Sequence, residues 1–295
     1  MNNDFLMRSL MFVPAHNDRL MQSASRSTAD VLLLDIEDSV QPVDNKQIAR
    51  DKILQYVKDG SFKNRILFSR INDRESGQLL KDVYQLCVDG ITGFMYPKAH
   101  CGQDIYFIGK LLETIEYDKG FPSGTFKLIP LIETTGAVMN IQDICTASPR
   151  VVAVAFGCED YVTDLGGKHD IEGQSIFFAR NMIVNGAHNC GVAAIDTVHI
   201  KVHDLEDLEK NLILSKKLGF DGMLVLNPKE LPLVHQYYSP SEEEITWAEE
   251  MVRLSEEAVE QGKGVAVKNN KFIGPPMVKM AKRILHKASM CKSEP

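Results

Sequence analysis

Acidic side chains follow apolar runs at three places in this sequence. Glu133 ends the run FKLIPLIE, and Asp160 comes shortly after the next run, VVAVAFG. The run DVLLLDIED carries three more acids, which are Asp35, Glu37 and Asp38. Converging carboxylates repel one another, and a hard divalent cation with oxygen ligands relieves that repulsion. We therefore predict a Mg²⁺ site made by Glu133 and Asp160, with Mn²⁺ as the alternative ion.

Three basic or titratable side chains stand at similar positions. Arg70 ends the run RILFSR and suits a bidentate contact with a substrate carboxylate. Lys98 follows ITGFMYP, where it is either a site residue or a solvated loop lysine. His16 follows RSLMFVPA, where it contacts substrate or hydrogen-bonds to the loop backbone. Together with the three acids of DVLLLDIED, these residues are the candidate catalytic groups.

Simpler explanations exist for several of these residues. A single Glu at a strand end is more often a surface or capping group than a metal ligand. One of the acids after DVLLL could cap the next element or pair with Arg50 or Lys52. Cys158, beside the proposed ligands, has no neighbour in sequence that would lower its pKa, which favours a small packing residue over a nucleophile. Because no His or Cys occupies an equivalent strand end, zinc and copper are less attractive than magnesium.

Continuous apolar runs, typical of strands buried on both faces of a parallel sheet, recur along the chain. The runs span residues 8–14, 30–37, 65–71, 91–98, 126–133, 151–157, 193–200 and 221–227. Eight β/α units and the length of 295 residues predict an α/β protein with a (β/α)8 TIM barrel. An open doubly wound sheet is the alternative, but no GxGxxG follows the first run. In a barrel, the side chains at the carboxyl ends of the strands form the site.

Polar segments with helical spacing, such as residues 44–60 and 204–219, lie between the runs. After the eighth run, Ser241 precedes three glutamates, a favourable start for a long amphipathic helix over 239–264. Residues 265–285 predict a short turn and another helix, whose basic face is solvated. We therefore predict a catalytic barrel over 1–238 and a C-terminal helical extension over 239–295 that belongs to the same structural unit.

Composition limits the classes of partner. The formal net charge is −7 and the basic residues form no block, so a nucleic-acid or anionic-membrane surface is not indicated. Six scattered cysteines without CxxC spacing favour a reducing cytoplasm. The first residues lack the charged start and long apolar core that a signal peptide would show, and no run approaches the roughly 20 apolar residues that span a bilayer. A small-molecule substrate is expected.

The motifs together resemble the HpcH/HpaI aldolase and citrate lyase β-subunit family along nearly the whole chain. They are RSLMFVPA, LLLDIEDSV with KQIAR, SRIN, YPK, IPLIET, FGCEDYVTDLG and GFDGMLVLNP. The resemblance implies a cytoplasmic Mg²⁺-dependent TIM-barrel lyase, often a homotrimer or hexamer. Such a lyase cleaves or forms a bond between an acyl-CoA enolate and a 2-oxo acid such as oxaloacetate, pyruvate or glyoxylate.

The resemblance also assigns roles. By position, Glu133 and Asp160 resemble the metal ligands, and Arg70 resembles the carboxylate-binding arginine. The acids Asp35, Glu37 and Asp38 resemble a cluster that holds metal-bound waters. Arg19 lies where some relatives contact the phosphates of CoA. Arg70, Glu133 and Arg19 are therefore the predicted substrate contacts.

Several functions remain open at this level. The first is a lyase for a 3-hydroxyacyl-CoA such as citryl-, malyl- or citramalyl-CoA, acting in either direction. An aldolase on a free 4-hydroxy-2-oxo acid and a non-catalytic paralogue that binds a 2-oxo acid are the alternatives. Neither the acyl group nor the choice between CoA and an acyl-carrier protein follows from the sequence.

Two positions depart from the family pattern. Relatives commonly end a tail motif in an Asp that reaches the neighbouring subunit's site, and here Gly274 stands at that position in NNKFIGPP. Eighth strands of the family usually end in His-Pro, whereas Asn227 precedes the proline here. The usual proton donor to the acyl-CoA enolate is thus missing, which makes a malate synthase or thioesterase variant less expected.

Overall fold

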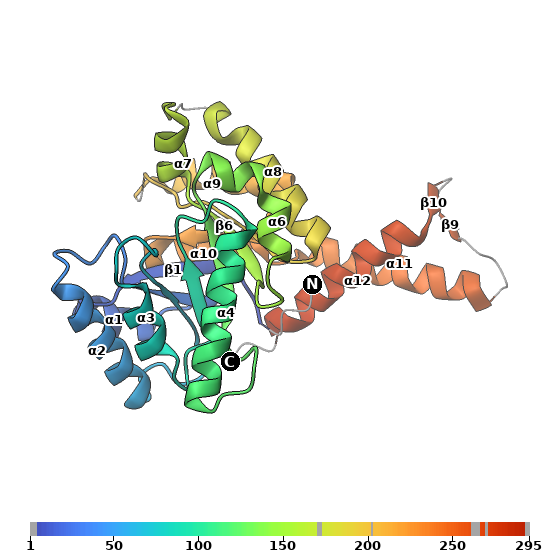
Figure 1. Cartoon of the computed structure of the whole chain (residues 1–295). Coiled ribbons are helices and arrows are strands. Elements are labelled where there is room, and N and C mark those ends of the chain that lie inside the picture. Colours follow the sequence, from blue (N-terminus) through green and yellow to red (C-terminus); the bar gives the residue numbers. More distant parts are fainter. Residues whose placement is uncertain (1–4, 170–172, 202, 261–265, 269–270, 293–295) are drawn as a thin grey trace. The chain divides into compact units, whose positions relative to one another are not determined.

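Eight parallel strands form a closed barrel, as Figure 1 shows. The computed structural model describes residues 5–169, 173–201, 203–260, 266–268 and 271–292. The strands pair in chain order, and β1 pairs with both β2 and β8. They are β1 (Ser9–Pro14), β2 (Val31–Asp35), β3 (Ile66–Arg70), β4 (Gly93–Tyr96), β5 (Lys127–Ile132), β6 (Ala153–Phe156), β7 (Ala193–Asp196) and β8 (Gly222–Val225). The predicted (β/α)8 barrel is confirmed, and the open sheet is excluded.

The barrel interior is filled by alternate side chains from the strands. Large residues such as Phe68 and Met95 on one side of the barrel meet small ones, Ala153, Ala155 and Ala193, on the other. All five residues of β2 are buried, as expected for a strand covered on both faces. This packed core leaves the carboxyl ends of the strands as the place where side chains can line an open site.

Helices follow the strands and surround the barrel (Figure 1). The predicted segments 44–60 and 204–219 form α2 and α9, and α9 ends at Gly219 in the left-handed conformation. The helices are α1 (Asp18–Ser25), α2 (Asn45–Lys58), α3 (Leu79–Leu86), α4 (Gly102–Lys119), α5 (Thr135–Met139), α6 (Ile141–Thr146), α7 (Cys158–Leu165), α8 (Gln174–Cys190), α9 (Leu205–Leu218), the 3₁₀ turn η1 (Pro228–Glu230) and α10 (Leu231–Tyr238).

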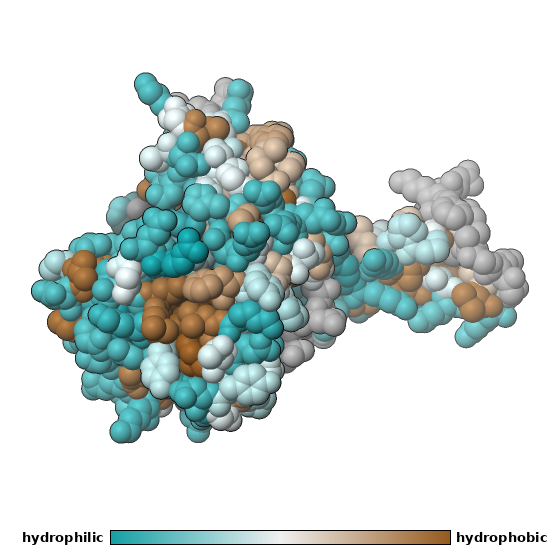
Figure 2. All heavy atoms as spheres, viewed as in Figure 1, coloured by the Kyte–Doolittle hydropathy of each residue, from teal (hydrophilic) through white to brown (hydrophobic). Residues whose placement is uncertain are grey.

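Exposed apolar side chains gather over α3 and α4, as Figure 2 shows. The large apolar or aromatic residues exposed on these helices are Leu80, Tyr84, Tyr106, Phe107 and Tyr117. Scattered exposed apolar residues are normal, but a gathered set is typical of a surface that meets another protein.

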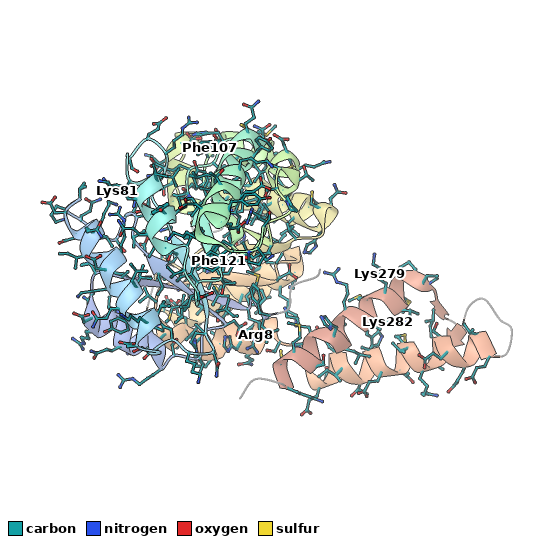
Figure 3. The ribbon with its side chains drawn as sticks, turned by 60° about the horizontal axis from the view of Figure 1, so that its bottom comes forward. Arg8, Lys81, Phe107, Phe121, Lys279 and Lys282 are labelled. Atoms are coloured by element: carbon teal, nitrogen blue, oxygen red, sulfur yellow. The ribbon has the colours of Figure 1, made fainter. Side chains whose placement is uncertain are left out.

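The C-terminal segment contains two long helices that lie side by side, α11 (Glu242–Glu260) and α12 (Pro275–Lys292) (Figures 1 and 3). The predicted cap of α11 is confirmed, because Ser241 Oγ accepts from the Glu244 N–H at 3.1 Å and Glu244 accepts from the Ser241 N–H at 2.8 Å. Ala248, Met251, Ala258, Ile273 and Ala281 form the buried cluster of this hairpin.

The prediction for residues 265–285 was incomplete. Two short antiparallel strands, β9 (Ala266–Lys268) and β10 (Lys271–Ile273), precede α12 where only a turn was expected. Three-residue strands are too short to show a reliable alternating pattern. On α12 the basic residues Lys279 and Lys282, labelled in Figure 3, are exposed, as predicted for a solvated face.

The chain divides into two compact units, residues 1–235 and 236–295, with the boundary inside α10. The predicted assignment of catalysis to 1–238 and of an extension to 239–295 stays a prediction. Among the described residues, no helix is both long and apolar enough to cross a membrane.

Candidate active site

Asp35 and Arg70 stand side by side at the carboxyl ends of β2 and β3. The two residues are register partners, and the Arg70 guanidinium donates Nε–H to Asp35 Oδ1 at 2.8 Å and Nη2–H to Oδ2 at 2.7 Å. Burial alone would raise the pKa of Asp35, but the Arg70 charge outweighs it and holds that pKa below its usual range. Asp35 is therefore a fixed anion that orients Arg70.

Arg70 has further contacts that hold its side chain in place. Its Nη1 lies 3.2 Å from Glu37 Oε2 and 3.8 Å from Asp38 Oδ2, and its Cζ lies 4.8 Å from the centroid of the Phe12 ring. The Arg70 side chain remains 12% exposed. A guanidinium held on several sides with one part accessible is suited to bind a substrate carboxylate without a large loss of conformational entropy.

Lys98 extends this network of charges. Its Nζ lies 2.9 Å from Glu37 Oε1 and 3.5 Å from Asp73 Oδ2. Burial would lower the pKa of Lys98, but the hydrogen bond and the charge of Glu37 raise it above its usual value. Burial raises the pKa of Glu37, although Arg70 opposes that shift. Lys98 is thus a permanent cation and not a general base.

Glu133 is the buried acid of the site. The Lys98 backbone adopts a left-handed φ of 53°, which directs its N–H to Glu133 Oε1 at 2.7 Å. Among the described residues, Oε2 of Glu133 has no hydrogen-bond donor. Burial raises the pKa of Glu133 to about 8, and the nearby Asp160 charge adds to the effect. One carboxylate oxygen is therefore fixed and the other is available to a ligand.

A cavity of about 370 Å³ brings several of these groups together. Asp35, Arg70, Glu133 and Asp160 line it, along with the apolar residues Phe12, Leu131, Phe156 and Leu224. Gly157 borders Glu133 so closely that a Cβ at this position would lie 2.9 Å from Oε2. The glycine keeps the space beside that oxygen open. Two carboxylates, one with an oxygen that accepts no hydrogen bond from the described residues, fit a hard divalent cation.

Glu37, Asp38, Lys98, His16 and Arg19 are not among the described residues that line this cavity. The first three adjoin it through Arg70 and Glu133. His16 accepts from Lys52 Nζ through its carbonyl at 2.8 Å, while its buried Nδ1 has no partner among the described residues. Arg19 is exposed on α1. Four predicted site residues therefore line one cavity, three more adjoin it, and His16 and Arg19 lie outside its lining.

Lys46 of the KQIAR motif holds the backbone of the acidic loop, which is the segment after β2 that carries Glu37 and Asp38. Lys46 Nζ donates to the carbonyls of Ile36 and Glu37, at 3.2 and 3.1 Å, and to the Asn72 side chain. Arg50 pairs with the buried Asp82, and Lys52 pairs with Asp18. The alternative that Arg50 or Lys52 neutralises the acids after β2 is therefore wrong.

Some site residues were not found from the sequence. Asp73, which pairs with Lys98, comes three residues after Arg70, so the pattern of acids after strands could have identified it. No local sequence pattern could have identified the contact between Lys46 and Asn72, because the two residues are 26 positions apart. Cys158 has its pKa raised to about 12 by burial, which agrees with a packing role and not with a nucleophile.

The raised pKa of Glu133 leads to a testable prediction. Binding of Mg²⁺ must displace the proton of Glu133, so the apparent Mg²⁺ affinity is expected to rise with pH up to the pKa of about 8 and then level off. Below that value the gain should be about tenfold per pH unit. Calorimetric titrations with Mg²⁺ from about pH 6 to pH 9 measure this. A flat profile would exclude Glu133 as a ligand.

Comparison with known proteins identifies the family. The HpcH/HpaI aldolase/citrate lyase family model matches residues 8–228. The citrate lyase subunit beta of Leuconostoc mesenteroides subsp. cremoris is 32% identical over 98% of this chain and 95% of that protein. The L-malyl-CoA/beta-methylmalyl-CoA lyase of Rhodobacter capsulatus is 27% identical over 97% of this chain and 96% of that protein.

A solved structure supports the same fold. The crystal structure of protein CitE from Mycobacterium tuberculosis, in complex with magnesium, acetoacetate and coenzyme A, matches with a TM-score of 0.75 and 24% identity. The match covers 96% of this chain and 98% of that one. This chain therefore belongs to the HpcH/HpaI aldolase/citrate lyase family and is a carbon–carbon lyase.

Proposed function

We propose that this lyase cleaves a citryl thioester into oxaloacetate and an acetyl thioester, with Mg²⁺ as its cofactor. The cavity that contains Glu133, Asp160 and Arg70 supports this most, because it offers oxygen ligands for a hard cation beside a guanidinium for a carboxylate. The citrate lyase relative is 32% identical and the malyl-CoA lyase relative 27%, which favours the citryl group. An aldolase on free acids and a non-catalytic paralogue are not favoured by these relatives.

Different residues would bind the metal and the substrate carboxylate. Glu133 and Asp160 would hold the metal, and Arg70, oriented by Asp35, would bind the carboxylate on the carbinol carbon. When bound, Mg²⁺ supplies positive charge that stabilises the developing negative charge on the substrate oxygens. Glu37 and Lys98 neutralise each other at 2.9 Å and keep the surroundings of Arg70 fixed.

Cleavage requires two proton movements. The carbinol hydroxyl loses its proton as the bond to the thioester methylene breaks, and its oxygen becomes the carbonyl oxygen of the 2-oxo acid. The electron pair of the broken bond passes to the thioester, whose enolate then takes up a proton to form the methyl group. Relatives commonly carry an Asp as the proton donor at the position of Gly274, and glycine has no carboxyl group. The source of that proton is therefore a group other than residue 274.

An assay of released 2-oxo acid tests the proposal. Citryl-CoA, malyl-CoA and citramalyl-CoA are each supplied with Mg²⁺, and free 4-hydroxy-2-oxo acids serve as the comparison. Oxaloacetate release from citryl-CoA at the highest kcat/KM is expected. Faster release of glyoxylate from malyl-CoA, or of pyruvate from citramalyl-CoA, would contradict the citryl group as the substrate. Turnover of the free acids alone would overturn the thioester proposal.

We also propose that the chain works as a homo-oligomer, a trimer or hexamer, in the cytoplasm. The exposed apolar residues over α3 and α4 support an interface between copies. Light scattering coupled to size-exclusion chromatography measures the mass. A monomer at micromolar concentration would contradict the oligomer.

A further inference from the structure

A second set of possible metal ligands lies at the start of α7. Cys158, Glu159 and His169 each offer one ligand atom, and these atoms lie within 4.8 Å of one another. His169 Nε2 lies 3.0 Å from Glu159 Oε1, and Cys158 Sγ lies 3.7 Å from the same oxygen. Neither Glu133 nor Asp160 belongs to this group. The ligand atoms of the cluster therefore differ from those of the carboxylate pair proposed for Mg²⁺, although Cys158 and Glu159 line the same cavity as that pair.

The two separations that involve Glu159 Oε1 are close to the edges of a tetrahedral zinc site. Zn–S bonds of about 2.3 Å and Zn–N or Zn–O bonds of about 2.0–2.1 Å place sulfur about 3.5 Å from oxygen, and nitrogen about 3.3 Å from oxygen. The buried Cys158 fixes the sulfur position. The side chains of Glu159 and His169 are 54% and 32% exposed, so both can make the small remaining adjustment.

We propose that Cys158, Glu159 and His169 bind Zn²⁺ or another thiophilic divalent cation. A thiolate, an imidazole and a carboxylate are ligands that zinc accepts, whereas Mg²⁺ prefers oxygen ligands alone. On binding, the sulfur–zinc bond forms, the thiol proton leaves to solvent, and the fourth position is taken by water. The sequence pattern of the strand ends did not indicate zinc, because His169 lies beyond the end of α7 and not at a strand end.

The cluster of Cys158, Glu159 and His169 lies beside two cavities. Cys158 lines the cavity that contains Arg70 and Glu133, and it also lines a second cavity of about 270 Å³. His169 lines the second cavity as well. Zinc at this point would tie the first turn of α7 to the chain after that helix, between the two cavities. The site would therefore be structural or regulatory, and it does not replace the Mg²⁺ site.

Cobalt is the spectroscopic probe for this proposal, because cobalt bound to a thiolate gives a charge-transfer band in the near ultraviolet. The full-length protein, saturated with Mg²⁺, is titrated with Co²⁺, and Zn²⁺ is then added as a competitor. The wild-type protein should show the band at one equivalent, and Cys158→Ser should lose it. Cys101→Ser, which changes a partly buried cysteine outside the cluster, should retain the band.

The other two ligands provide an independent readout that does not depend on the buried cysteine. Both side chains are partly exposed, so Glu159→Gln and His169→Asn should fold normally and each should weaken Zn²⁺ binding by about tenfold or more. A cobalt band that persists in Cys158→Ser would overturn the proposal. Unchanged zinc affinity in both other variants would do the same, as would loss of the tight zinc site in Glu133→Gln.

Discussion

Arg70→Lys is expected to lower kcat/KM for the thioester by about 100- to 1000-fold, in the range seen when one preorganised donor to a developing charge is lost. Lysine keeps the charge but cannot donate two hydrogen bonds to Asp35 and also present a nitrogen to a substrate carboxylate. The KM for oxaloacetate in the condensation direction should rise, because carboxylate binding is weakened. Steady-state kinetics in both directions measure the two effects.

A matched control separates this loss from a general effect of the substitution. Arg65 precedes the same strand at the opposite end of the barrel, where it donates to the carbonyls of Ser27 and Ala29. Arg65→Lys should therefore keep kcat/KM close to that of the wild type. Wild-type kinetics in Arg70→Lys, with the fold intact by circular dichroism, would exclude Arg70 as the carboxylate ligand.

Glu133→Gln is expected to abolish Mg²⁺-dependent turnover, a loss of at least about 1000-fold, because a neutral amide is a poor ligand for a hard cation. The variant should fold well. With a pKa of about 8, Glu133 is mostly protonated at neutral pH in the metal-free protein, and glutamine resembles that neutral form. Calorimetry with Mg²⁺ and an activity assay give the two readouts.

The raised pKa of Glu133 also predicts how the free energy of unfolding depends on pH. The usual pKa of a Glu side chain is 4.5, and in the folded, metal-free protein the pKa of Glu133 is raised to about 8. Between these two pH values the folded protein keeps a proton on Glu133 that the unfolded chain has lost. Stability therefore falls as pH rises through this window, and Glu133→Gln should remove that fall. Denaturant titrations at several pH values measure it.

Two further variants define the metal site. Asp160→Asn should also lose Mg²⁺ binding, since Asp160 lines the same cavity. Glu113→Gln changes a partly exposed carboxylate on α4 that pairs with Lys110 in the same helix, and it should behave as the wild type. Retention of Mg²⁺ affinity in both Glu133→Gln and Asp160→Asn would exclude the carboxylate pair.

Much of the fold could be predicted because strands buried on both faces produce apolar runs that are visible in the sequence. The last residues of those runs also indicated Asp35, Arg70 and Glu133, because barrel geometry fixes where strand ends lie. The left-handed Lys98, whose N–H binds Glu133, could not be predicted, since a non-glycine residue with positive φ leaves no pattern in composition. The contacts of Lys46 behind the acidic loop depend on tertiary packing, which no local pattern encodes.

The most direct test is a crystal structure of the protein with Mn²⁺ and oxaloacetate, in which anomalous scattering locates the metal. We expect a peak within bonding distance of Glu133 and Asp160, with a carboxylate of oxaloacetate on the Arg70 guanidinium. A metal peak only at Cys158, Glu159 and His169, or oxaloacetate bound away from Arg70, would contradict the proposed active site.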